Sequence, residues 1–262
     1  FRHSDGNVAT YMENYMTLDG FWEESDADQV ATARQIVDFS TANGDYICVG
    51  VGKKIRAFDD ATATWSTQGS FGKDATYLFS NDQYLFVATP GEAFWRWDGT
   101  AGGGWKQPGA GKDFNGFCIH NQTLYAFDGY QIIPCTTMAG ATADWGTAIT
   151  VGWSTTSISD MFSDGDYLYI CKPEGFYYYD GSNVKQVIDA TEIRSADNFR
   201  GGCAWHGALY LPRGLSLHKA VVSSSSRTVT EIPMSMYGSI GMERYGHGEP
   251  IRCFAGPDRI FV

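Results

Sequence analysis

The chain has 262 residues, of which 15% are aromatic and only 19% charged, and its formal charge is −11. The sequence pI is close to 4.8. An acidic chain offers no basic surface for phosphate groups, so neither sequence-independent nor sequence-specific nucleic-acid binding is expected. No apolar run reaches the roughly 18 residues of a membrane-spanning helix, so no membrane span is expected.

The two ends of the sequence are the least informative parts. The chain opens with Phe1, shows no signal peptide, and stops at Val262 inside an apparent strand. We therefore expect a segment of a longer polypeptide. Residues 1–33 are predicted to be an irregular N-terminal segment in which residues 15–22 read as strand, Asp-Gly turn and strand.

The rest of the chain, residues 34–262, reads as one unit repeated several times. Each unit consists of short aromatic and β-branched runs separated by Gly, Asn, Asp or Pro turns, the pattern of antiparallel strands. The predicted units lie near residues 34–70, 75–110, 114–150, 157–190, 199–233 and, as a partial unit, 250–262.

The clearest unit begins at Ser159 and runs to Gly181. Asp164-Gly165 lies between two apolar runs, which predicts a two-residue hairpin, because both residue types tolerate positive φ. Lys172-Pro173-Glu174-Gly175 reads as the next turn, with Phe176 to Tyr179 as the third strand. Asp180-Gly181 predicts a further hairpin.

The second strands of the units recur about every 40 residues, and four strands per period are the signature of propeller blades. We therefore predict an all-β protein, a β-propeller of six four-stranded blades. Residues 11–24 and 251–262 would together complete the sixth blade, so that N- and C-terminal strands close the ring and remove open sheet edges. No helix of ten or more residues is expected.

The six cysteines show no CxxC pair and no histidine at metal-ligand spacing. Five of the six fall inside predicted strands. The burial tendency of cysteine favours small buried side chains that stay free thiols, although disulfides are an alternative in an oxidising environment.

The turn between the second and third strands carries a glycine in each complete unit: Gly52, Gly91, Gly129, Gly175 and Gly214. Glycine permits a tight turn, and charges near it are ordinarily solvated. A functional alternative is that these turns contact a partner protein. The candidate partner-binding residues are Lys53, Lys54, Glu92, Asp128, Lys172, Glu174 and Arg213.

Tryptophans recur at the ends of units, and this favours packing between blades. The residues are Trp65, Trp105 and Trp145, with Trp95, Trp97, Trp153 and Trp205 elsewhere. The alternative is sugar binding, in which aromatic rings stack on a glycan.

Enzyme signatures are missing from the sequence. Residues 60–65 partly match the Asp-box turn of sialidases, but Thr62 replaces its central glycine, and no arginine triad or Tyr–Glu pair can be assembled. His120 and His206 occupy equivalent hairpin turns. No Ser-His-Asp, HExxH, Walker or GxGxxG pattern occurs, and Asp164-Gly165-Asp166 lacks the further oxygen ligands of a calcium loop. We expect no enzyme, no cofactor and no metal.

Two stretches, residues 45–65 and 84–99, resemble the blades of propeller proteins in tailed bacteriophages, and residues 172–181 and 198–214 follow the same pattern. The shared pattern is strand, Gly turn, a strand ending in aromatic-Asp-Gly, then Trp. The resemblance covers residues 34–262 and implies a structural or adaptor protein of the tail, neck or fibre region. It carries no catalytic residue.

The expected function is thus a non-enzymatic virion module, a rigid propeller scaffold that contacts other virion proteins within a symmetric homo-oligomeric assembly. The alternative is a carbohydrate-binding propeller lectin or a secreted glycosidase-like protein, for which the partner is a glycan and the location extracellular.

Overall fold

The computed structural model describes residues 33–81, 83–108, 112–137, 144–192, 194–213, 216–222, 229–234, 254–255 and 260–261. Within these ranges every regular element is a β-strand, and there is no helix that could span a membrane. The chain divides into two compact units, one of residues 1–115 and 138–143 and one of residues 116–137 and 144–262. The all-β prediction is confirmed.

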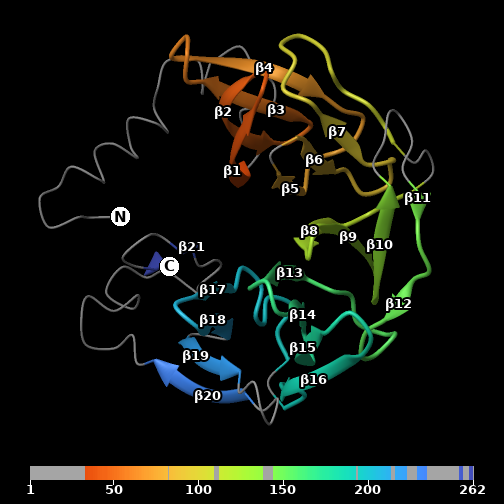
Figure 1. Cartoon of the computed structure of the whole chain (residues 1–262), viewed down its shortest axis with the longest axis vertical. Helices are drawn as coiled ribbons and strands as arrows, with labels where there is room; N and C mark the ends of the chain where they lie inside the picture. Colours follow the sequence, from red (N-terminus) through yellow and green to blue (C-terminus); the bar gives the residue numbers. More distant parts are fainter. Residues whose placement is uncertain are drawn as a thin grey trace, which may run out of the picture. The chain divides into compact units, whose positions relative to one another are not determined.

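The first compact unit contains two antiparallel sheets, drawn in red to yellow in Figure 1. The first has four strands in chain order: β1 (Ala33–Thr41), β2 (Gly44–Val51), β3 (Lys54–Asp59) and β4 (Thr64–Ser70). The second has three: β5 (Tyr77–Ser80), β6 (Leu85–Ala88) and β7 (Trp95–Trp97). In place of a fourth strand, an isolated bridge pairs Arg96 with Lys106.

The second compact unit begins with a five-stranded sheet in which β11 and β12 both pair with β10. Its strands are β8 (Gly116–His120), β9 (Thr123–Asp128), β10 (Gln131–Thr137), β11 (Asp144–Trp145) and β12 (Ile149–Thr150). The predicted fourth strand of this unit is therefore divided into two short pieces.

Two regular four-stranded sheets follow in chain order, and then a short pair of strands. The strands of the first are β13 (Asp160–Ser163), β14 (Leu168–Lys172), β15 (Gly175–Tyr179) and β16 (Val184–Asp189). Those of the second are β17 (Cys203–Trp205), β18 (Ala208–Arg213), β19 (Ser216–Val222) and β20 (Val229–Met234). The short pair is β21 (Phe254–Ala255) with β22 (Ile260–Phe261).

The first strands of successive sheets contact one another within each compact unit: β1 with β5 in the first, and β8 with β13, β13 with β17 and β17 with β21 in the second. Aromatic side chains fill the space between sheets. Tyr169 and Phe176 stack with ring centroids 5.5 Å apart, and both pack with Leu209 and Leu211 of the next sheet. Each sheet thus buries its apolar face against its neighbour, as blades do.

Loop lengths differ from the sequence prediction at the Asp-Gly turns. Ser163 pairs with Leu168 and Tyr179 with Val184, so both loops have four residues instead of two. In both, the aspartate accepts hydrogen bonds from the backbone N–H groups two and three residues later. The aspartate side chain takes the place of a backbone partner, which favours the longer loop.

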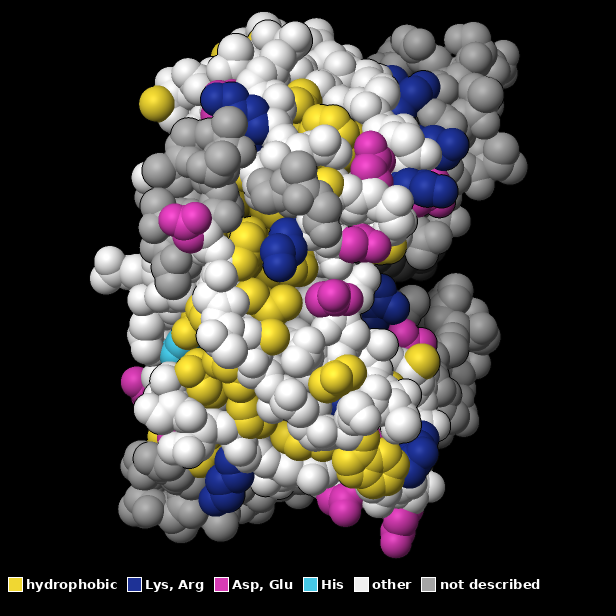
Figure 2. Space-filling view, turned by 90° about the vertical axis from the view of Figure 1, so that its right-hand side faces the viewer, with side chains coloured by type: hydrophobic (Ala, Val, Ile, Leu, Met, Phe, Trp, Pro, Cys, Tyr) yellow, Lys and Arg dark blue, Asp and Glu magenta, His cyan; other side chains and the backbone are white. Residues whose placement is uncertain are grey.

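The surface mixes apolar and charged side chains. Figure 2 shows hydrophobic side chains reaching one face of the molecule among Lys, Arg, Asp and Glu. The large exposed hydrophobic residues in the described part of the chain are Ile36, Trp153 and Val221. Ile36 lies in β1, Val221 in β19 and Trp153 between β12 and β13, and single exposed apolar side chains are ordinary on a protein surface.

Residues 11–24, and the side chains of residues 251–262, lie outside what the structure describes. The predicted closure of the ring by N- and C-terminal strands and the number of six blades therefore remain predictions.

Candidate functional site

The predicted partner-binding residues have unequal environments. In the first compact unit, Lys53 is exposed while Lys54 and Glu92 are half-buried. In the second, Asp128 is exposed and Arg213 is half-buried. Glu92 accepts hydrogen bonds from the backbone N–H groups of Gly72 and Lys73. It holds a neighbouring loop in addition to any contact with a partner.

The glycines of these turns have two different roles. Gly52, Gly91 and Gly129 adopt φ values of +53°, +84° and +53°, which favour glycine over other residues. Gly175 instead lies in β15, where an added Cβ would be 2.8 Å from the Ile188 carbonyl oxygen. Gly214 lies outside the described residues.

Lys172 and Glu174 are buried, so the expectation that they are available on the surface is wrong. Both side chains are 0% exposed, and Lys172 Nζ lies 2.9 Å from Glu174 Oε1. Lys172 Nζ also donates to the carbonyl oxygens of Val151 and Trp153. The segment before β13 folds over the turn and supplies these partners, which a reading of the turn alone does not reveal.

The carboxylate of Glu174 is equally well satisfied. It accepts hydrogen bonds from the backbone N–H of Trp153 and from the hydroxyls of Thr156 and Tyr177. Burial raises the pKa of Glu174, but the hydrogen bonds from Thr156 and Lys172 outweigh it and leave the pKa below its ordinary value. Burial lowers the pKa of Lys172, opposed by Glu174. The pair anchors the chain and is unavailable to a partner.

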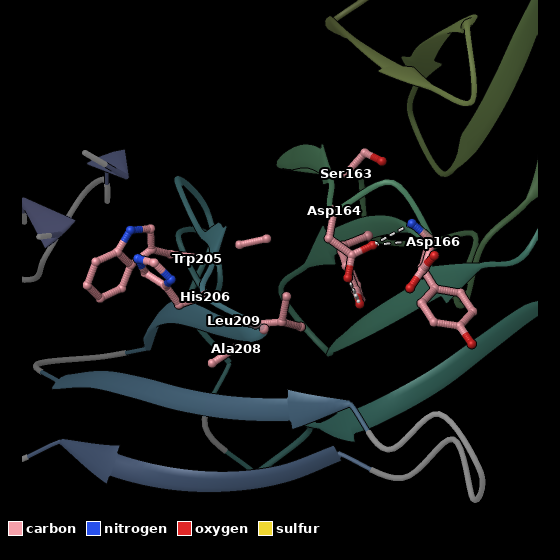
Figure 3. Close-up of a pocket in the computed structure, with 11 residues that line it drawn as sticks. Ser163, Asp164, Asp166, Trp205, His206, Ala208 and Leu209 are labelled. Atoms are coloured by element: carbon pink, nitrogen blue, oxygen red, sulfur yellow. Dashed lines mark hydrogen bonds between the residues drawn. The ribbon is translucent and has the colours of Figure 1, made fainter. Parts of the chain in front are cut away.

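A cavity of about 500 Å³ lies at the opposite end of β14 from this ion pair. It is lined by the β13–β14 loop and by the β17–β18 turn, the first turns of two successive sheets. Figure 3 shows Asp164 and Asp166 on one side, Trp205 and His206 on the other, and Ala208 and Leu209 between them. Its remaining lining residues are Ser163, Tyr167, Tyr169, Ala204 and Gly207.

Asp164 organises the first side of the cavity. Its Oδ1 accepts from the backbone N–H groups of Asp166 and Tyr167, and its Oδ2 accepts from the Tyr169 hydroxyl at 2.7 Å. Burial, and then the hydrogen bond to Asp164, raise the pKa of Tyr169 far above its ordinary value, so the phenol remains a donor. Gly165 has a φ of +99°, which suits glycine at the second loop position.

A buried histidine forms a hydrogen bond to Ser163, the residue before the Asp164 loop. His120 is 2% exposed, and its Nδ1 lies 2.9 Å from Ser163 Oγ. Asn121 Nδ2 lies 3.1 Å from His120 Nε2, and because an amide nitrogen only donates, Nε2 accepts and Nδ1–H donates to Ser163. Burial lowers the pKa of His120, against the raising effect of Asp164 and Asp166. In this tautomer the imidazole cannot take a proton from Ser163.

The second side of the cavity is a tight hairpin. Trp205 pairs with Ala208, and the two loop residues His206 and Gly207 have φ values of +47° and +71°. Two successive positive φ values are typical of a type I′ turn, whose twist matches that of the flanking strands. The rings of Trp205 and His206 meet edge to face with centroids 4.3 Å apart. The Trp205 indole is thus fixed beside the cavity.

From sequence, the Asp164 and His206 turns are predicted as hairpin turns, a calcium loop is rejected at the first, and the cavity that the two turns share is not predicted. The available signal was the equivalence of these turns in successive units. First turns of neighbouring blades lie at the same end, so their polar and aromatic residues converge.

The tryptophan prediction is supported in the first compact unit. Trp97 is fully buried and stacks on Trp105 with centroids 5.7 Å apart. Trp97 Nε1 donates to the Thr100 carbonyl oxygen, and Trp105 Nε1 to that of Gln68. Phe71 lies against both Trp95 and Trp105. Trp97 thus packs inside the protein, and the half-buried rings of Trp95 and Trp105 pack against the same core.

The described cysteines are free thiols: Cys48, Cys118, Cys135 and Cys171 are buried, and Cys203 is half-buried. Cys253 lies outside the described residues. Among the described residues no group of three or more His, Cys, Asp or Glu side chains is placed to hold a metal ion.

Neither a protein-family model nor a curated protein sequence matches the chain. Solved structures do match it. The β-propeller domain of Cps50 (Swd1) from Myceliophteria thermophila superposes with a TM-score of 0.54 at 14% identity, over 75% of this chain and 68% of that one.

Two bacterial proteins give a similar result. The extracellular domain of a one-component system from B. thetaiotaomicron has a TM-score of 0.59 at 10% identity, over 78% of this chain and 28% of that one. PorZ, a surface component of the type-IX secretion system of Porphyromonas gingivalis, has a TM-score of 0.53 at 12% identity, over 78% of this chain and 27% of that one. The chain thus spans little more than a quarter of either protein, and the likeness shows the β-propeller fold alone.

Proposed function

We propose that the chain is a non-enzymatic β-propeller scaffold for protein–protein contacts. One observation carries this proposal: strands and turns differ in exposure. The strands are buried and packed by aromatic rings, while turns such as Gly52-Lys53 and His206-Gly207 expose the side chains of Lys53 and His206 to solvent. Rigid blades hold such turns in place, and binding residues can vary on turns without loss of the fold.

The specific setting that we propose is a virus particle, in the tail, neck or fibre region of a tailed bacteriophage, in a symmetric homo-oligomeric assembly. Support for this setting comes from the blade pattern of residues 45–65 and 84–99, which resembles phage propellers. The solved propellers with a similar fold come from Myceliophteria thermophila, B. thetaiotaomicron and Porphyromonas gingivalis, so they support the scaffold and leave the setting to experiment.

Quantitative mass spectrometry of purified particles tests the proposal, with any tailed phage whose genome encodes the chain as the source of the particles. The chain should be present in a fixed ratio to other virion proteins, and cross-linking should join exposed Lys53 to a neighbouring protein. A particle fraction free of the chain, with the chain found only in the medium, would overturn the virion setting in favour of a secreted protein. A chain that cross-links to no protein in either fraction would overturn the scaffold.

A further inference from the structure

We propose that the cavity between the β13–β14 loop and the β17–β18 turn binds the guanidinium group of an arginine side chain that a partner protein presents. The inference rests on the proposed function as an interaction scaffold and names the chemistry by which one partner is recognised. The cavity is formed by residues of a single compact unit.

Charge is the first argument for a cationic ligand. Asp164 and Asp166 are the carboxylates of the lining, and no lysine or arginine lines the cavity. Asp164 is engaged by two backbone N–H groups and by Tyr169, which fix its position. Asp166 is exposed, and its carboxylate makes no hydrogen bond or ion pair with the described residues. Asp166 is therefore the group available for a new charge-assisted hydrogen bond.

Aromatic surface is the second argument, and it favours arginine over lysine. Trp205, His206 and Tyr167 contribute rings to the lining, and Ala208 and Leu209 give it an apolar floor, as Figure 3 shows for the labelled residues. A guanidinium is planar and weakly hydrated, so it stacks on aromatic rings while its N–H groups bond a carboxylate. A compact, strongly hydrated ammonium uses such a surface less well.

The site is also preformed. The Asp164 loop is held by its own side-chain hydrogen bonds and by Ser163, which His120 contacts from below. The opposite turn has the restricted geometry of a type I′ hairpin. The cavity, at about 500 Å³, lies in the range of small-ligand sites. Binding to a preformed site avoids the entropic cost of ordering loops.

A neutral sugar is the competing ligand, because sugars also combine aromatic stacking with hydrogen bonds to carboxylates. Two like charges with no cation beside them attract a guanidinium by a Coulomb term that a neutral ring lacks. The lining therefore favours the cation, and the sugar becomes an outcome of the test.

The test is calorimetric titration of the full chain at low ionic strength with acetyl-Gly-Arg-Gly-amide. The matched probe replaces arginine by citrulline, which has nearly the same shape and no charge, and two further probes are the lysine peptide and methyl β-glucoside. The arginine peptide should bind at least about tenfold more tightly than the citrulline peptide, and its affinity should fall as salt is added. Equal affinities for the two peptides would overturn the inference, as would tighter binding of the glucoside.

Variants locate the binding. Asp166→Asn should weaken the arginine peptide by about tenfold, because it removes a charge-assisted hydrogen bond, and it leaves the loop hydrogen bonds intact. His206→Asn, which keeps a residue tolerant of positive φ, should weaken it by a smaller factor. Asp60→Asn, at another exposed aspartate, is the control and should change nothing. Unchanged binding by Asp166→Asn would place the arginine elsewhere.

The two proposals fail separately. If the Asp166→Asn variant still cross-links to its neighbours in particles, and no arginine peptide binds the isolated parent chain, the scaffold stands and the arginine site does not. If the peptide binds and particles lack the chain, the arginine site stands and the virion setting does not.

Discussion

Lys172 and Glu174 belong to a Lys-Pro-Glu-Gly turn. Such polar turns are ordinarily exposed to solvent, yet both side chains are 0% exposed. Five partner groups outside the pair satisfy them: the carbonyl oxygens of Val151 and Trp153, the N–H of Trp153, and the hydroxyls of Thr156 and Tyr177. A buried ion pair of this kind adds little net stability over an apolar pair, but the loss of one partner is costly.

We expect Lys172→Met to lower the free energy of unfolding by about 3–5 kcal/mol, because it leaves the Glu174 carboxylate buried without its cation. The double variant Lys172→Met with Glu174→Gln should lose less than the sum of the two single variants, since neither charge is then left alone. Urea unfolding of the full chain measures both. Lys53→Met, at an exposed turn lysine, is the control and should stay within about 0.5 kcal/mol of the parent chain. A Lys172→Met variant as stable as this control would contradict the structural role.

The four-residue loops between strands share one pattern of side-chain hydrogen bonds. Asn81, Asp164 and Asp180 each open such a loop, and each accepts hydrogen bonds from the N–H groups two and three residues later. Asp164 differs in one respect, because its second oxygen accepts from Tyr169 of the following strand. The same hydrogen-bonded loop type thus occurs three times, and at Asp164 it also lines a cavity.

Asp164→Ala should lower the free energy of unfolding by about 2–3 kcal/mol, and Asp180→Ala by about 1 kcal/mol, because Asp164 also accepts the hydrogen bond of the Tyr169 phenol. In a Tyr169→Phe background the loss from Asp164→Ala should fall toward that from Asp180→Ala. Urea unfolding of the four variants gives the comparison. Equal losses from Asp164→Ala in both backgrounds would show that the tyrosine contact adds nothing.

The strand pattern is where the sequence was most informative, and the contacts across loops are where it was least so. Apolar runs and the turn residues between them place strands such as Leu168–Lys172 and Gly175–Tyr179 correctly, because a hairpin pairs strands that are adjacent in the chain. The predicted two-residue loop at Asp164 was wrong, because Asp-Gly fits a four-residue loop as well as a two-residue one.

The site escaped prediction for a related reason. The burial of Lys172 depends on Val151 and Trp153, some twenty residues earlier, and the cavity depends on turns from two successive sheets. Neither relation leaves a local pattern. The Lys172–Gly175 turn, predicted from sequence to bind a partner, therefore contains a buried ion pair. The Asp164 turn, predicted only as a hairpin turn, lines the cavity.

At the scale of the whole molecule, the prediction that remains is ring closure by residues 11–24 and 251–262. If it is right, a chain truncated to residues 33–262 loses strands of the closing blade and exposes sheet edges. Its thermal midpoint should fall by several degrees, and its exposed edges should pair into irregular aggregates larger than any assembly of the full chain. Differential scanning calorimetry and size-exclusion chromatography with light scattering measure the two effects. A truncated chain that keeps the midpoint of the full chain and the same number of copies per particle in solution would rule out closure by the N-terminal segment.

The buried thiols have a practical consequence. Burial, then the nearby Asp38, raise the pKa of Cys48 to about 12, and burial raises the pKa of Cys171 well above its ordinary value. A thiolate reacts with alkylating reagents and a thiol does not, so both residues are chemically silent while their sheets stay closed. Cys48 lies in one compact unit and Cys171 in the other. The rate at which each cysteine is alkylated, measured by mass spectrometry, therefore reports how often its own compact unit opens, and the two units can be followed separately.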